Sequence, residues 1–315
     1  MVKQGKSDRA TAAPLRVGDA IRRKIRVKAK SEGRLRPPLP GPFTLATQAL
    51  SMLRIFWKPL GGILLIYLTL NFIFSGGIGK DYSLVAEIKG YIQDSPTHLS
   101  ALGSALAGFG LLASGSDGSG TSASTGFTSI LLVIVSLTTI WALRHLIAGQ
   151  EVSVKESYYQ AMKPLVPFLL IILVIFLQLL PMSIGAALLN TVLRGTVTDS
   201  QIITIVFSFL FVALSVWTVY MLTSSILALY IVTLPDRHPR QALRSAKKVV
   251  ASRRWPVLFR LAALPVFILV SMAVVIVPLI FWAAPLVLPA YFALSGVALL
   301  FTHTYLYNFY RSLIE

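Results

Sequence analysis

Apolar residues gather along this chain in six long stretches that are separated by polar segments. The stretches cover about 56–75, 126–147, 165–188, 203–232, 257–279 and 286–307. A helix needs roughly 20 mostly apolar residues to cross the hydrocarbon core of a bilayer. The pattern therefore predicts an all-α, polytopic membrane protein with six transmembrane helices in a membrane domain that covers 46–315.

The last two stretches share one uninterrupted run, because no charged residue occurs between Leu261 and Thr302. A run of 42 residues is too long for one crossing. Prolines occur in the middle of this run, at positions 278, 285 and 289. We therefore expect two helices joined by a tight hairpin near Trp282, a residue type typical of the membrane interface.

Charge then orients the six spans. Only 13% of the 315 residues are charged, the mean hydropathy is +0.74 and the formal net charge is +17. With the N-terminus inside, 26 Lys and Arg fall in inner segments and 3 in outer ones. Because Lys and Arg concentrate on the cytoplasmic side, this asymmetry predicts a multi-pass plasma-membrane protein with both termini in the cytoplasm.

Two polar regions flank or interrupt the spans. Residues 1–45 form a basic tail, which we expect to be disordered and held electrostatically at the inner leaflet. The alternative is that this tail binds a cytoplasmic protein partner. Residues 76–125 form an external loop with a Gly/Ser linker at 114–126. Within this loop, 97–113 is short, rich in Gly, Ala and Ser and weakly apolar, so it is interpreted as an external helix that lies on the membrane or packs on the bundle. A seventh span there would reverse the orientation of everything downstream.

The strip from Leu234 to Phe259 holds seven Lys or Arg against one Asp, between two of the most apolar stretches. At 100° per residue it resolves into two faces. The apolar face carries Ala242, Leu243, Ala246, Val249 and Val250, and the opposite face carries Arg240, Arg244, Lys247 and Lys248. This pattern predicts a helix from Pro239 that lies in the inner interface with its apolar face on the lipid.

The strip allows three interpretations. Its charges could only fix the topology, they could contact a phospholipid headgroup or a protein partner, or they could bind nucleic acid. The flanking spans and the apolar face already account for the pattern, so no nucleic-acid partner is expected. The candidate contact residues are Arg240, Arg244, Lys247, Lys248, Arg253 and Arg254, the last two beside Trp255 at the start of the fifth span.

The core of each span lacks Asp, Glu, Lys and Arg, and the polar residues that remain are Gln178 and small hydroxyls such as Ser208, Ser215, Thr218, Ser224 and Ser225. Ion-coupled carriers usually need an ionisable group inside the membrane. An amide in a span commonly forms a hydrogen bond between helices. We expect that role for Gln178, and a contact to a transported substrate is the alternative.

No pattern predicts catalytic or metal-binding chemistry. The chain has no Cys, and its four histidines, at positions 98, 145, 238 and 303, are dispersed without metal-ligand spacing. His98 is expected outside and the other three at the inner boundary in contact with solvent. The sequence therefore predicts neither a cofactor nor an enzyme.

The segment "LALYIVTLPDRHPRQALRSAKKVVASRRWPVLF" resembles a bacterial family. It is similar to the multi-pass membrane domain attached to some glycerophosphodiester phosphodiesterases, and to related stand-alone six-span proteins of unknown function. The resemblance rests on an apolar helix end, an acidic turn at Asp236, Pro239, Ala242, Leu243 and Ser245, and Trp255 before the next span. It implies the architecture; no hydrolase activity carries over, because the soluble phosphodiesterase domain is absent.

The sequence leads to one functional hypothesis and one alternative. The first is a non-enzymatic integral membrane protein with an accessory or scaffold role, which contacts anionic phospholipid of the inner leaflet. The alternative is a transporter or permease-like subunit with a path through kinked helices. A lipid-modifying enzyme is disfavoured by the lack of catalytic pairs.

Overall fold

The structure, a computed structural model, describes residues 39–74, 90, 122–193, 201–234, 238–251 and 253–314. These residues form α-helices and one short 3-10 helix, with no strand among them. Six of the helical segments are long and apolar enough to cross a membrane: Trp57–Phe74, Gly126–Ile147, Leu165–Leu193, Gln201–Val232, Arg254–Trp282 and Ala284–Ile314. The predicted all-α class is confirmed, and the number of helices that are long and apolar enough to cross a membrane agrees with the six predicted spans.

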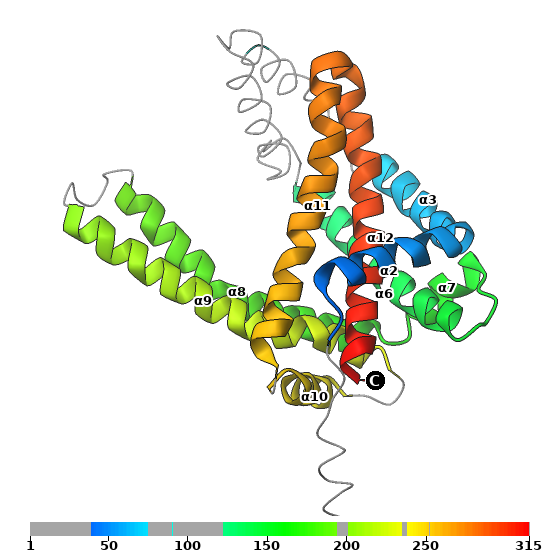
Figure 1. Ribbon diagram of the computed structural model, residues 1–315, viewed down its shortest axis with the longest axis horizontal. Helices are drawn as coiled ribbons and strands as arrows, with labels where there is room; N and C mark the ends of the chain where they lie inside the picture. The colour runs from blue at the N-terminus through cyan, green and yellow to red at the C-terminus, as the bar shows by residue number, and fades with distance from the viewer. Residues whose placement is uncertain are drawn as a thin grey trace, which may run out of the picture. The chain divides into compact units, whose positions relative to one another are not determined.

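The longest helices, α8 (Leu165–Leu193) and α9 (Gln201–Val232), lie side by side as an antiparallel pair (Figure 1). The two helices approach closely at Gly185, where an added Cβ would lie 3.1 Å from Leu214 Cδ1. Most side chains of the pair point away from other protein, as apolar helices in lipid do. Only their ends near α10 (Pro239–Ala251) join the main core.

The last two spans form the predicted hairpin. Helix α11 (Arg254–Trp282) ends where Ala283 donates its N–H to the carbonyl of Leu279, and the 3-10 turn Ala284–Leu286 leads into α12 (Val287–Ile314). Pro285 lies in that turn, where its missing N–H costs nothing. Trp282, at the hairpin, is 87% exposed.

A helix that the sequence analysis did not predict precedes the first span. Helix α2 (Pro42–Ile55) begins with proline at its first position and buries Leu45, Ala46 and Ala49. It packs mainly on α12, and α3 (Trp57–Phe74) follows after one residue. The predicted tail, 1–45, therefore extends too far, because its last residues are helical and packed; residues 1–38 lie outside the described residues, as does 97–113.

A short helix on one end of the bundle joins two spans. Helix α7 (Val154–Ala161) follows α6 (Ser122–Ile147) after a turn in which Gly149 has φ +76°, a conformation that favours glycine. Tyr158 of α7 donates its hydroxyl to the carbonyl of Ile63 in α3, at 3.1 Å. Burial raises the pKa of this phenol to about 12.

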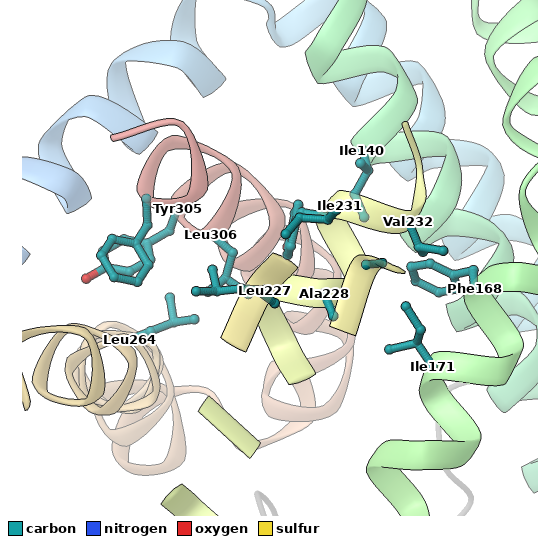
Figure 2. Packing of buried hydrophobic residues seen from close by; sticks show 14 of the residues in the cluster. Ile140, Phe168, Ile171, Leu227, Ala228, Ile231, Val232, Leu264, Tyr305 and Leu306 are labelled. Atoms are coloured by element: carbon teal, nitrogen blue, oxygen red, sulfur yellow. The ribbon is translucent and has the colours of Figure 1, made fainter. Parts of the chain in front are cut away.

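The main core lies where the α10 ends of the spans meet, within one unit, Pro40–Glu315. Figure 2 shows Phe168 of α8 beside Val232 of α9, with Ile140, Ile231 and Leu306 nearby. Tyr230, Tyr305 and Phe309 are its largest fully buried side chains. The packing of this core holds the ends of several helices against one another.

Candidate functional site

Helix α10 carries the basic strip, and it begins at Pro239 as predicted. Its buried residues are Ala242, Ala246 and Val250, which repeat every four positions along one face. They belong to the main core and pack chiefly on α9, with further contacts to α8 and α11. The apolar face was expected on lipid, but the structure places it on protein, because the ends of these spans supply the apolar surface.

The opposite face of α10 presents four cations to the surroundings. Arg240, Arg244, Lys247 and Lys248 are all exposed. Within the described part of the chain, none of them has a hydrogen-bond or ion-pair partner. Four positive side chains on a helix that is packed by its other face give this surface a concentrated positive charge.

The other two basic candidates, Arg253 and Arg254, contact other parts of the protein. Arg254, at the start of α11, lies with its guanidinium carbon 4.4 Å from the ring centroid of Tyr220 in α9. This cation–π contact holds the charge against protein. The backbone of Arg253 bonds to Val250 and Val257, so this residue joins α10 to α11. Trp255 next to them is 81% exposed.

Gln178 forms the interhelical hydrogen bond that was expected of it. Ser225 of α9 donates its hydroxyl to Gln178 Oε1 of α8 at 2.8 Å. Two other hydroxyls of α9 turn back on their own helix: Ser208 bonds to the carbonyl of Thr204, and Ser224 to that of Met221. The buried hydroxyls of Ser215 and Thr218 have no hydrogen-bond partner among the described residues. The amide of Gln178 is thus used in packing α8 on α9.

Sequence reasoning missed a hydrogen-bonded chain that crosses three helices. Ser136 of α6 donates to the carbonyl of Leu132, so its oxygen can accept from His303 Nε2 of α12, at 2.9 Å. Nδ1 of the same ring is then an acceptor, and the hydroxyl of Tyr230 in α9 lies 3.1 Å from it. For a neutral ring, these contacts assign the tautomer with its proton on Nε2. His303 was expected at a solvated boundary.

The sequence also gave no sign of a pocket of about 900 Å³ between the end of α6, α7, the start of α8 and the end of α9. Its lining includes charged and amide side chains: Arg144, Gln150, Glu156, Gln160 and Lys163. It also includes apolar side chains: Leu137, Trp141, Pro164, Pro167, Val232 and Leu234. The lining thus combines polar and apolar side chains, as ligand pockets do.

Arg144 is the most firmly held of the polar lining residues. Its two terminal nitrogens donate to the carbonyl and to the hydroxyl of Thr233, both at 2.7 Å. Thr233 follows the last residue of α9, where carbonyls lack helical partners and a positive charge is favourable. The guanidinium therefore links α6 to the end of α9 and occupies a defined place in the pocket wall.

Two histidines line the same pocket. The ring of His145 stacks on Trp141 with centroids 3.9 Å apart, and its Nδ1 lies 2.9 Å from the carbonyl of Trp141. His238 lies immediately before α10, so the pocket adjoins the basic helix. The described residues include no group of three His, Asp or Glu placed to hold a metal ion. His98 lies outside the described residues.

Comparison of the chain with models of protein families, with curated proteins and with solved structures found no match. The resemblance to the membrane domain of glycerophosphodiester phosphodiesterases therefore stays an expectation from the sequence. Any function has to be argued from the residues themselves.

Proposed function

We propose that this chain is a non-enzymatic, multi-pass protein of the plasma membrane that binds anionic phospholipid through α10, in an accessory or scaffold role. The observation that carries the proposal is the exposed row of Arg240, Arg244, Lys247 and Lys248 on a helix docked against α8, α9 and α11. An anionic leaflet is the negative surface closest to a helix at the ends of membrane spans.

The energetics favour a lipid contact of useful strength. Each Lys or Arg close to an anionic leaflet contributes on the order of 1 kcal/mol. Because the buried face of α10 is already packed, the helix loses little further conformational freedom when its cations meet headgroups. The attraction is screened by salt, with a Debye length of about 8 Å at physiological ionic strength.

The orientation is part of the same proposal. The Lys and Arg count, 26 against 3, favours a cytoplasmic position for the α10 end of the bundle. With six spans, both termini then lie in the cytoplasm, and the basic tail meets the same leaflet as α10. The tail offers a second contact, to lipid or to an acidic protein partner.

Transport was the competing function, and it relied on polar groups inside the spans. Gln178 is hydrogen-bonded to Ser225 between two packed helices, which supports a role in packing. The accessory role is therefore the function that the geometry supports best.

The test uses the full-length protein in nanodiscs that contain phosphatidylglycerol and phosphatidylcholine. Fluorescent phosphatidylglycerol near the protein is measured by energy transfer from a donor attached to it, at low and at high salt. We expect enrichment of the anionic lipid, with loss of most of it in the triple variant R244Q/K247Q/K248Q and at high salt. The matched control is R54Q/K58Q/K155Q, which removes three exposed cations from α2, α3 and α7. Equal enrichment around both triple variants would contradict the proposal.

A further inference from the structure

The pocket beside α10 contains side chains that are suited to one bound molecule rather than to a lipid surface. It has a volume of about 900 Å³, within the range of small-molecule sites. It lies between four helical elements that also contribute residues to the main core. A pocket of this size between packed helices can select a ligand by shape and charge.

Arg144 supplies the means to bind a phosphate. An Arg side chain has five N–H donors, and two of those of Arg144 are used on Thr233. The others are not hydrogen-bonded within the described part of the chain. The planar fork of a guanidinium matches the oxygens of a phosphate, and a fork that is already anchored loses little entropy on binding.

The formal charges of the lining indicate how much negative charge the ligand carries. Among the lining residues that the structure describes, Arg144 and Lys163 are positive and Glu156 is negative, which leaves one positive charge in excess with the histidines neutral. A phosphodiester carries one negative charge and balances it. Glu156, Gln150 and Gln160 offer acceptor oxygens to hydroxyl groups on the same headgroup.

The apolar wall indicates that the ligand is not only a headgroup. Leu137 and Trp141 of α6 face the pocket together with Val232 and Leu234 at the end of α9. These helices are spans, so an alkyl chain that leaves the pocket along them enters the surroundings of apolar helices. A water-soluble phosphate ester would leave this wall unused.

We propose that the pocket binds one phosphodiester lipid, with its phosphate at Arg144 and Lys163 and the first part of its acyl chains along Leu137, Trp141, Val232 and Leu234. This inference goes beyond the proposed function, because it concerns a stoichiometric site that uses none of the four cations of α10. It assigns to the chain a single recognised lipid in addition to the leaflet that α10 contacts.

The test is native mass spectrometry of the full-length protein with three probes that separate the two halves of the ligand. Phosphatidylglycerol has phosphate and chains, diacylglycerol has chains only, and glycerol phosphate has phosphate only. We expect one phosphatidylglycerol per chain, no retained diacylglycerol and no displacement by equimolar glycerol phosphate. Retention of diacylglycerol, or displacement by glycerol phosphate, would show that one half of the proposed recognition is wrong.

Single substitutions test whether the lipid binds in this pocket. Arg144→Gln and Lys163→Gln should each weaken phosphatidylglycerol binding about tenfold, because each removes a charge-assisted contact. Lys163 is exposed, so its substitution keeps the test valid if Arg144→Gln fails to fold. Lys155→Gln, an exposed lysine outside the pocket, is the matched control and should bind normally.

The triple variant R244Q/K247Q/K248Q separates this inference from the proposed function. It should keep the single bound lipid while it loses the surrounding enrichment. Loss of the single lipid in this variant, or unchanged binding in both Arg144→Gln and Lys163→Gln, would overturn the pocket as its site.

Discussion

His303 Nε2 lies 2.9 Å from Ser136 Oγ, and this contact joins α12 to α6 inside the membrane domain. The same ring reaches Tyr230 of α9, so one imidazole links three spans. Because an unpaired polar group is costly away from water, such a chain holds its helices in one arrangement.

A double-mutant cycle should measure this link. We expect Ser136→Ala and His303→Ala each to lower the free energy of unfolding, with a coupling of about 0.6 to 1.7 kcal/mol, as for other interhelical hydrogen bonds in membranes. Denaturant titration of the purified protein provides the measurement. Ser295→Ala is the control, because its hydroxyl bonds to Phe292 of its own helix and should show no coupling to His303. Zero coupling for Ser136 would contradict the assigned hydrogen bond.

The Gln178–Ser225 pair should respond unequally to its two deletions. Ser225→Ala leaves the Gln178 amide without its partner among apolar helices, and we expect a loss of about 1–3 kcal/mol. Gln178→Leu should cost less, because a serine hydroxyl can turn to a carbonyl of its own helix. Thermal unfolding in detergent compares the two variants. A larger loss for Gln178→Leu would refute the packing role of the pair.

Two neighbouring glycines of α3 provide a matched pair for the contact with α7. A Cβ on Gly62 would lie 2.7 Å from Val154 Cγ2, whereas one on Gly61 would meet nothing within 4 Å. Valine is stiff at χ1 and cannot easily move aside. We expect Gly62→Ala to lower the unfolding temperature, and Gly61→Ala to leave it unchanged or raise it, since alanine favours helix by about 1 kcal/mol. The same change in both variants would contradict this account.

The environment of Tyr158 predicts how the stability depends on pH. Its pKa is raised from 10.0 to about 12, because burial disfavours the phenolate. The unfolded chain thus loses this proton before the folded chain does. The stabilising contribution is complete below pH 10 and is lost as the pH rises towards 12.

Titration of tyrosinate absorbance provides the measurement for Tyr158. The difference between the wild type and Tyr158→Phe should reveal one phenol that ionises late, and the variant should lose less stability across this window. Tyr159→Phe is the control, since that neighbouring side chain is 73% exposed. A measured pKa of Tyr158 close to the ordinary 10.0 would show that this side chain is not buried against α3.

The sequence predicted the six spans because the length of an apolar run is a local property. The hairpin at Trp282 could be predicted for the same reason, since Pro285 marks the break within the local sequence. Helix α10 was predicted from its two faces, but the partner of its apolar face was not. Lipid and the ends of other spans are both apolar, and the pattern of one helix does not distinguish them.

What escaped prediction depends on packing between distant segments. Ser136, Tyr230 and His303 are separated by 94 and 73 positions, and only the packing of three helices brings them together. The pocket is likewise formed from the ends of four elements. Helix α2 was missed for a different reason, because its short and mixed sequence follows a polar tail without a strong apolar period.

The link between Arg144 and Thr233 gives one side chain two uses at once. The guanidinium stabilises the end of α9, and it also faces the pocket. A phosphate that binds the remaining N–H donors of Arg144 would hold the guanidinium in place beside Thr233 and so strengthen that link. Occupancy of the pocket would then oppose fraying of the last turn of α9, and a change at the pocket would be felt by α10, the next helix along the chain.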